Sequence, residues 1–247
     1  MKRFLLNIFT IMAALTVLIL TGCRTDYTKN AVERARTYAL NNLKGLSDNQ
    51  RNFIRFTQPE IYENIIFEDT PHLSFAAIPG MKERTITING PSKSYAMTGW
   101  RCGYLAAPAP FCEMMTEATH TLAICCPMPT QYAALEAYTG PQDSLKIQRD
   151  IYRYRRDIVW DMLKKLDFEV VTPHAGFYVF FNVTSTGLDS EEFCMRLLKE
   201  ERVLIFPGSL FADRSNKYAR ISLLAPTDRV EEATVRITRF VNNLRKK

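Results

Sequence analysis

A serine–lysine pair near the middle of the chain, Ser92-Lys93, has neighbours that suit it to chemistry. The β-branched run at residues 85–88 predicts a buried strand, and Asn89-Gly90-Pro91 predicts a sharp turn directly after it. A lysine held on such a turn can present its amine as a nucleophile and as a proton carrier. Arg101, eight residues further on, has a planar guanidinium that can clamp a phosphate at two points. Taken alone, however, most Ser-Lys pairs are solvated surface.

The whole segment around the lysine is more specific than the pair. Residues 89–104, which read NGPSKSYAMTGWRCGY, resemble the lysine segment of the class I/II aminotransferases, the fold-type I enzymes of pyridoxal 5′-phosphate (PLP). The resemblance implies that Lys93 is the catalytic lysine, which forms a Schiff base with the cofactor aldehyde. It also implies that Ser92 and Arg101 bind the cofactor phosphate. Two glycines are expected to let the backbone of this segment approach closely: Gly99 and Gly103.

Two further landmarks lie on either side of this segment. Glu60-Ile61-Tyr62-Glu63 resembles the family sequence whose tyrosine bonds the phenolate oxygen of the cofactor, which implies that role for Tyr62. Residues 218–222 resemble the segment whose arginine binds the substrate α-carboxylate, and the two-donor fork of Arg220 suits a monocarboxylate. Without the resemblance, Tyr62 reads as a packed strand aromatic and Arg220 as an ordinary strand arginine.

The resemblance covers roughly residues 60–247 and departs from the family at Pro59. The family has an aspartate there, three residues before the tyrosine, which keeps the pyridine nitrogen of the cofactor protonated. Proline has no charge and cannot accept that proton. Family members are also considerably longer on the N-terminal side, so we expect a truncated chain without the glycine-rich phosphate loop or the stacking aromatic ring. The expected consequence is weak PLP binding and slow turnover.

The N-terminus resembles a bacterial lipoprotein signal. Met1-Lys2-Arg3 is basic, residues 4–20 are almost wholly apolar, and Leu20-Thr21-Gly22-Cys23 places small residues before a cysteine. The pattern predicts a signal peptide over residues 1–22, cleavage before Cys23, lipidation of its sulfur and a membrane-anchored location. The alternative is an uncleaved membrane anchor, although the apolar run is short for a membrane span.

The remaining cysteines disagree with export. They are odd in number, and the adjacent pair Cys125-Cys126 suits a disulfide framework poorly. Such cysteines are typical of buried thiols in a reducing compartment, which favours a cytoplasmic origin for the aminotransferase-like portion. The set is Cys102, Cys112, Cys125, Cys126 and Cys194.

The composition is that of an ordinary globular protein. The chain has 247 residues, of which 47% are hydrophobic and 23% charged, and this excludes a collagen-like, low-complexity or wholly disordered protein. The net charge of +6 is scattered apart from Arg245-Lys246-Lys247, so we expect no nucleic-acid partner. The three histidines lie far apart in sequence and show no metal-ligand spacing, so we expect no metal site.

The alternating strands and amphipathic helices of the last third predict an α+β layer. Together with the resemblance, this implies an α/β fold: a truncated PLP-transferase large domain plus a C-terminal α+β small domain, preceded by a signal and a helical segment. The expected segments are 1–22 (signal peptide), 23–57 (helical spacer), 58–140 (partial large domain with the lysine segment), 141–167 (connecting helix) and 168–247 (small domain).

Within these segments the pattern predicts individual elements. Strands are expected at residues 85–88, 168–171, 177–183, 203–206 and 218–224, a strand or turn at 61–67, and helices at 128–138, 142–166, 190–200 and from 227 onward. The core face of the 142–166 helix is expected to include Ile151, Tyr154, Ile158, Met162 and Leu166. That of the last helix is expected to include Val230, Ala233, Ile237, Val241 and Leu244.

The resemblance therefore implies a PLP-dependent aminotransferase, which moves an amino group from an amino acid to a 2-oxo acid. Its partners would be these two substrates, a second copy of the chain in a homodimer, and a membrane through Cys23 if the signal is used. The alternative, from another class, is a non-catalytic, lipid-anchored lipoprotein that carries an aminotransferase remnant.

Overall fold

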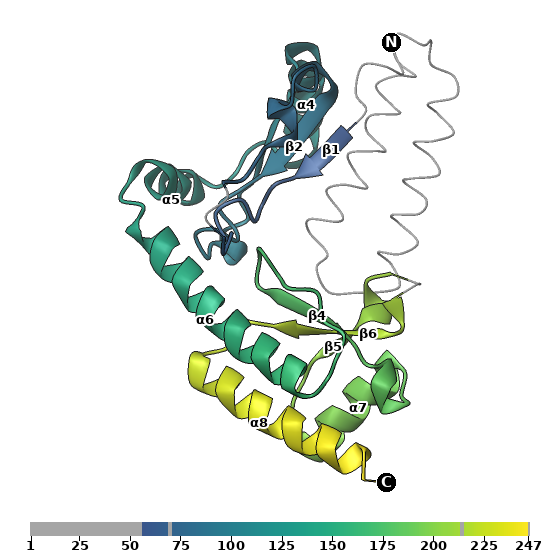
Figure 1. Cartoon of the computed structure of the whole chain (residues 1–247). Coiled ribbons are helices and arrows are strands. Elements are labelled where there is room, and N and C mark those ends of the chain that lie inside the picture. The colour runs from purple at the N-terminus through teal and green to yellow at the C-terminus, as the bar shows by residue number, and fades with distance from the viewer. Residues whose placement is uncertain (1–55, 69–70, 213–214, 247) are drawn as a thin grey trace, which may run out of the picture. The chain divides into compact units, whose positions relative to one another are not determined.

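A computed structural model of the chain describes residues 56–68, 71–212 and 215–246 (Figure 1). The predicted signal peptide, Cys23 and nearly all of the predicted helical spacer lie outside the described residues. The chain forms two compact units. Among the described residues, unit 1 comprises residues 56–61 and 73–140, and unit 2 comprises residues 62–68, 71–72, 141–212 and 215–246. Unit 2 thus combines the expected connecting helix and small domain with a short segment from before the lysine.

Unit 1 contains a three-stranded sheet in the order β1-β2-β3. Its strands are β1 (Phe56–Pro59), β2 (Thr85–Asn89) and β3 (Tyr104–Ala106). β1 runs parallel to β2 and β3 antiparallel to it, with Ile88 paired to Pro59 on one side and to Leu105 on the other. The expected strand at residues 85–88 is confirmed as β2, because its β-branched residues suit a buried strand. Short 3₁₀ turns connect the strands: η1 (Phe75–Ala77), η2 (Lys82–Arg84) and η3 (Thr98–Trp100).

Two helices follow this sheet in unit 1, and both begin with prolines. α5 (Met128–Thr139) confirms the helix expected at residues 128–138, whereas α4 (Ala109–Ala123) was not expected from the sequence. Pro108 caps α4 and another proline lies in its first turn. A proline in the first turn removes no intrahelical hydrogen bond, so these residues start the helix and do not interrupt it.

Unit 2 contains a second three-stranded sheet, wholly antiparallel, in the order β4-β6-β5. Figure 1 shows α6 and α8 side by side along this unit, and the two helices pack against each other. The elements are α6 (Asp143–Lys165), β4 (Tyr178–Asn182), η4 (Thr184–Thr186), α7 (Ser190–Glu201), β5 (Phe206–Pro207), η5 (Gly208–Leu210), β6 (Tyr218–Ser222) and α8 (Thr227–Leu244). The expected α+β layer at the C-terminal end is therefore present in this unit.

The core of unit 2 is built around aromatic rings. Phe193 on α7 is fully buried and meets Phe181 and Phe240 edge-on, with ring centroids 5.9 and 5.3 Å apart. The α7 helix is fixed at its start by Asp189, whose side chain accepts hydrogen bonds from two backbone N–H groups of the first turn. Edge-to-face packing of this kind joins α7, α8 and the sheet into one core.

The predicted core face of the last helix is confirmed, but that of α6 is only partly correct. Val230, Ile237 and Val241 are buried. On α6, by contrast, Ile151 and Tyr154 are exposed. The residues that α6 buries are Tyr152, Arg156, Val159, Met162 and Leu163. An arginine belongs to this face because Arg156 donates to the Pro173 carbonyl oxygen and stacks on Phe67, and a hydrophobic pattern cannot register either contact.

Some expected strands are shorter or absent. Residues 168–171 contribute one isolated bridge, Val170 with Phe181, and residues 61–67 form turns with one bridge, Ile66 with Ala175. β5 has two residues, fewer than the expected 203–206. The buried thiols expected from the sequence are confirmed only for Cys194, since Cys125 is exposed and the others are half-buried. Among the described residues, none of the helices is long and apolar enough to cross a membrane.

Replacing Phe193 by alanine should lower the free energy of unfolding of unit 2 by about 3–5 kcal/mol. The substitution leaves a cavity, and the packed rings of Phe181 and Phe240 prevent the surrounding structure from filling it. Met195→Ala is the matched control on the same helix, since Met195 is 51% exposed and should change stability by less than about 0.5 kcal/mol. Urea unfolding followed by the fluorescence of Trp160, in a Trp100→Phe background, measures both. Equal losses for the two variants would contradict the assignment of Phe193 to the core.

Candidate active site

The lysine segment forms the loop between β2 and β3, and the two ends of this loop touch at a glycine. A Cβ on Gly90 would lie 2.8 Å from the Cys102 carbonyl oxygen and 3.0 Å from the Gly103 Cα, which is closer than real Cβ atoms come to backbone. The Gly90 N–H also donates to the Asn89 Oδ1 at 2.7 Å. A Cβ at Gly99 would have no atom of the described residues within 4 Å, so the close approach expected there stays a prediction.

Inside this loop the backbone turns tightly around the lysine. The Tyr95 N–H donates to the Pro91 carbonyl oxygen at 3.0 Å, which closes a turn over residues 91–95. Ser94 is buried, whereas Ser92 and Lys93 are half-buried. The expected tight turn after β2 is therefore confirmed, and it anchors the loop on both sides of Lys93.

Arg101 lies at the far end of the same loop, directly after η3. Its backbone is left-handed, with φ of 55°, and its Nη1 donates to the Thr98 carbonyl oxygen at 2.9 Å. The preceding residue, Trp100, accepts a hydrogen bond from the buried Thr130 of α5 at 3.1 Å. The side chain of Arg101 is exposed. The structure thus brings Ser92, Lys93 and Arg101 onto one loop that is tied to β2, β3 and α5.

Pro59 lies on the strand next to this loop. It is the last residue of β1 and pairs with Ile88, one residue before β2 ends. The carboxyl ends of parallel strands share one edge of a sheet, so Pro59 lies beside the start of the lysine loop. The next residue, Glu60, is buried, and its carboxylate accepts hydrogen bonds from Ser74 Oγ and the Phe75 N–H at 2.9 and 3.0 Å. At this edge, position 59 therefore supplies no carboxylate.

Arg220 lies in unit 2 on β6, the central strand of its sheet. Its guanidinium carbon lies 3.6 Å from the ring centroid of Phe211, 4.1 Å from that of Tyr178 and 5.8 Å from that of Phe206. Burial lowers the pKa of Arg220, and no carboxylate of the described residues pairs with its charge. A partly buried cation between aromatic faces is held by cation–π attraction and can still accept an anion.

Tyr62 belongs to the same unit and packs on its core. Its ring meets Phe177 edge-on, with ring centroids 5.3 Å apart. Burial raises the pKa of Tyr62 from its ordinary value of 10.0 to about 12; a hydrogen bond with Tyr178 adds to the rise, and the charge of Arg220 opposes it. Tyr62, Tyr178 and Arg220 thus form one electrostatic group. Lys93 and Arg101 belong to unit 1, so the two groups of candidate residues are described separately.

Sequence reasoning missed the aromatic residues around Arg220. Tyr178 lies in a segment that was expected only as a strand, and Phe211 lies directly after η5, outside the elements expected from the sequence. The register of the sheet is the signal that indicates these aromatic surroundings, because Phe206 and Phe180 on the two neighbouring strands both pair with Arg220.

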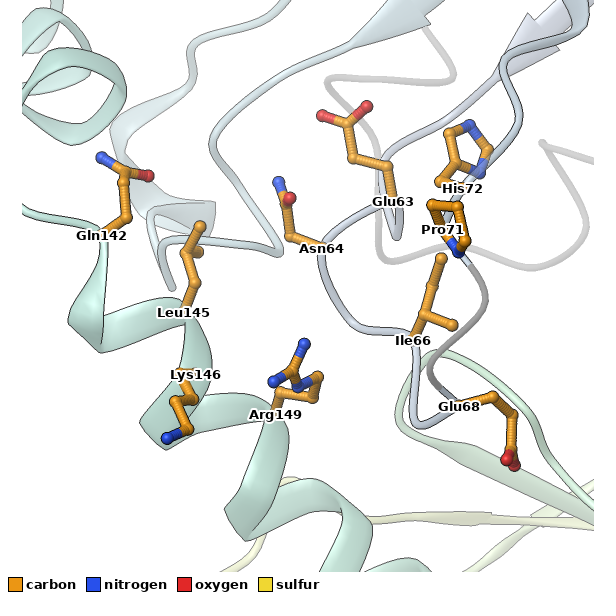
Figure 2. A pocket seen from close by; sticks show the side chains of 10 residues that line it. All are labelled: Glu63, Asn64, Ile66, Glu68, Pro71, His72, Gln142, Leu145, Lys146 and Arg149. Carbon is orange, nitrogen blue, oxygen red and sulfur yellow. The ribbon is translucent and has the colours of Figure 1, made fainter.

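An open cavity of about 420 Å³ lies elsewhere in unit 2 (Figure 2). Figure 2 shows it between the first turns of α6 and residues 63–68. Its walls carry side chains of both charge signs: the acidic residues are Glu63 and Glu68, and the basic residues are Lys146 and Arg149 on α6. It contains none of the site residues expected from the sequence.

The family profile for aminotransferase class I and II matches residues 39–237. The chain belongs to this family. The match begins 21 residues before residue 60, so it extends further toward the N-terminus than the motifs alone indicated. Among the relatives of this aminotransferase chain is the aspartate aminotransferase of Pyrococcus abyssi, 39% identical over 184 residues, which are 74% of this chain and 47% of that protein.

Two further comparisons agree. The aspartate aminotransferase of Bacillus sp. (strain YM-2) is 40% identical over 201 residues, covering 77% of this chain and 50% of that protein. The crystal structure of an aromatic aminotransferase from Pyrococcus horikoshii OT3 is 37% identical, with a TM-score of 0.75 over 83% of this chain and 56% of that one. The aminotransferase fold is thus present over a partial length, and the chain spans about half the length of the curated relatives it matches.

The raised pKa of Tyr62 should make unit 2 less stable at high pH. The folded state holds the Tyr62 proton up to about pH 12, whereas the unfolded chain releases it near pH 10, so its contribution is complete below pH 10 and is lost between pH 10 and 12. Tyr62→Phe should therefore show a smaller fall in unfolding free energy between pH 8 and 12 than the parent chain. Urea unfolding at each pH, followed by Trp160 fluorescence, measures this, and equal falls would contradict it.

Proposed function

We propose that this aminotransferase chain binds PLP and uses it to transfer amino groups from an amino acid to a 2-oxo acid. One observation supports this above all: a closed loop after β2 holds Lys93 and Ser92 at one end and Arg101 at the other. The proposal includes a homodimer, which the family resemblance implies. The names of the relatives support an amino-acid substrate class but do not extend to a particular amino acid.

The residues present suit the aldehyde and the phosphate of the cofactor but not its ring nitrogen. Lys93 offers an amine for the aldehyde, and the exposed guanidinium of Arg101, with the hydroxyl of Ser92, offers donors for the phosphate. The Gly90 closure brings the two ends of the loop together, which lets these donors act on one molecule. Pro59 does not suit the ring nitrogen, because it has no group that could hold a proton there.

PLP, when bound, supplies an aldehyde that takes up the substrate amine and a ring that accepts electrons from the substrate α-carbon. In the proposed function, the Lys93 amine would take the proton from the substrate α-carbon and deliver it to the cofactor carbon that carried the aldehyde. Ser92 and Arg101 hold the phosphate, which fixes the orientation of the reacting atoms. Tyr62 would donate its hydroxyl proton to an anionic oxygen, and its raised pKa keeps that proton in place at neutral pH.

Arg220 would bind the substrate carboxylate. Its guanidinium is partly buried among aromatic rings and has no carboxylate partner among the described residues. An incoming carboxylate would therefore compensate a charge that no described residue pairs with. Phe211 and Tyr178 restrict the guanidinium, so less freedom is lost when the anion binds.

The proline at the end of β1 also favours a second candidate function. Without a carboxylate at position 59, the ring nitrogen lacks the partner that makes the ring a strong electron acceptor. A chain with this residue could bind the cofactor and turn over slowly, or serve as a non-catalytic protein that carries an aminotransferase portion. Trapping of the cofactor and measurement of turnover distinguish these functions.

Treating the full chain with PLP and then borohydride should fix the cofactor on Lys93. A fixed Lys93 resists trypsin, so the label should appear on the peptide of residues 85–101 and disappear in Lys93→Ala. Arg101→Ala should weaken PLP binding roughly ten- to a hundredfold, because it removes charge-assisted hydrogen bonds worth about 1.5–3 kcal/mol. Lys82→Ala is the control, since Lys82 is an exposed lysine outside the loop.

Label spread evenly over exposed lysines, or unchanged trapping in Arg101→Ala, would contradict the proposed cofactor site. With an amino-acid panel and 2-oxoglutarate, the chain should turn over far below the range of about 1–1000 per second that is usual for enzymes. A rate within that range, abolished by Lys93→Ala, would show that position 59 needs no carboxylate.

We also propose, from the sequence of the first 23 residues, that the chain is anchored to a membrane by a lipid on Cys23. In cells that process lipoproteins, Cys23→Ser should leave the N-terminus uncleaved or move the protein out of the membrane fraction. Cys125→Ser is the matched control and should change neither. An unchanged membrane fraction with a cleaved N-terminus in Cys23→Ser would contradict the anchor.

A further inference from the structure

Two thiols lie side by side at the closed end of the lysine loop. Cys126, two residues before α5 begins, donates its thiol proton to the Arg101 carbonyl oxygen at 3.6 Å. The neighbouring thiol, Cys102, hydrogen-bonds to the Cys126 side chain. The sulfur of Cys126 therefore lies against both the peptide that joins Arg101 to Cys102 and the Cys102 side chain. These contacts all lie within unit 1.

The backbone on both sides of this thiol pair is held in place. The Cys102 carbonyl oxygen lies against Gly90, and Tyr104 pairs with Asn89 in the sheet. On the other side, the α5 helix is tied to the same loop through Thr130 and the Trp100 carbonyl oxygen. The Cys126 sulfur lies 3.6 Å from the Arg101 carbonyl oxygen, which belongs to the peptide that leads into Cys102, so the two cysteines lie on neighbouring anchored segments. Rotation of the side chains is the movement that would bring the sulfurs to the disulfide length of about 2.05 Å.

The two thiols are also accessible to a small reagent, because Cys102 and Cys126 are half-buried, whereas Cys194 is buried in the core of unit 2. Burial raises the pKa of Cys102, and the contact with Cys126 raises it further. A thiol with a raised pKa is mostly protonated at neutral pH and therefore reacts slowly. Within the described residues, Cys102 and Cys126 are the two cysteines found in contact with each other.

We propose that Cys102 and Cys126 form a reversible intramolecular disulfide that ties the lysine loop to the start of α5. The oxidant is a low-molecular-weight disulfide, such as oxidised glutathione. The thiolate of one cysteine attacks a sulfur of this reagent and displaces its thiolate, and the other cysteine then attacks the mixed disulfide and releases the second thiol. Two protein thiols become one disulfide, one small disulfide becomes two thiols, and two protons pass to the leaving groups.

The bond would replace the thiol donor that now reaches the Arg101 carbonyl oxygen. It would fix the loop next to Arg101 by a covalent link, and this holds whether or not PLP binds. If the proposed function is also correct, the link lies next to a residue assigned to the cofactor phosphate.

The test maps the thiols of the full chain after incubation with oxidised glutathione at pH 8. Free thiols are blocked with N-ethylmaleimide, and the chain is digested with chymotrypsin and with a glutamate-specific protease. Cleavage after Tyr104 and Glu113 separates Cys102 from Cys125 and Cys126, which trypsin would leave on one peptide. The expected result is one cross-link between these peptides, two fewer blocked thiols per chain, and full reversal by dithiothreitol.

Single variants identify the partners. Cys102→Ser and Cys126→Ser should each abolish the cross-link, whereas Cys125→Ser and Cys112→Ser should retain it. Oxidation should also raise the thermal midpoint of the parent chain and leave that of Cys126→Ser unchanged. Full blocking of Cys102 and Cys126 after oxidation, or loss of the cross-link only in Cys125→Ser, would overturn the proposal. Because the mapping needs no PLP, failure of the cofactor site cannot imitate either result.

Discussion

The contact of Gly90 with the backbone of residues 102–103 is the constraint on which the candidate site depends. A Cβ at position 90 would overlap the Cys102 carbonyl oxygen, so only glycine allows the two ends of the loop to meet. β2 and β3 can then pair from Asn89 to Thr87, and the loop between them becomes a fixed element. The positions of Lys93 and Arg101 both follow from this closure, because they lie on the two sides of the same loop.

Unit 2 holds a cation, Arg220, that forms no ion pair with any described residue. Arg220 lies on the central strand of a sheet, where burial lowers its pKa and the nearby rings compensate part of the desolvation. The two tyrosines share this environment, since burial and their mutual hydrogen bond raise the pKa of Tyr62 while Arg220 lowers it. An arrangement that leaves a guanidinium unpaired costs stability, and such a cost is usual where an anionic ligand completes the site.

The sequence predicted regular elements well where local pattern decides them. β2 follows from its β-branched run, and the buried face of α8 follows from its helical period. Prediction from the sequence failed where tertiary contacts decide which residues are buried. The α6 helix carries apolar residues on two faces, and only packing selects the face with Val159. The α4 helix was not expected, and the structure places Pro108 at its N-cap and another proline in its first turn, where proline is tolerated. Close approach depends on which atoms lie opposite a glycine, which is why the sequence did not reveal the contact at Gly90.

The same distinction applies to the site. Motif resemblance nominated Lys93, Arg101, Tyr62 and Arg220 as candidate site residues, because their neighbours in sequence resemble those of the family. It gave no information about Phe211, which contacts Arg220 only through the fold. It also could not show that Pro59 lies beside the strand that leads into the lysine loop, and that register makes its missing carboxylate important.

The cysteines show how a structure can change the weight of a compositional argument. An odd number of cysteines with an adjacent pair indicates a reducing compartment only if none of them are placed to bond. In this chain Cys125 is exposed and Cys126 lies against Cys102, so the adjacent residues have different surroundings. One member of the pair packs on the lysine loop and the other faces solvent. All five cysteines of the described residues are free thiols, so their number and spacing alone settle neither their redox state nor the location of the chain.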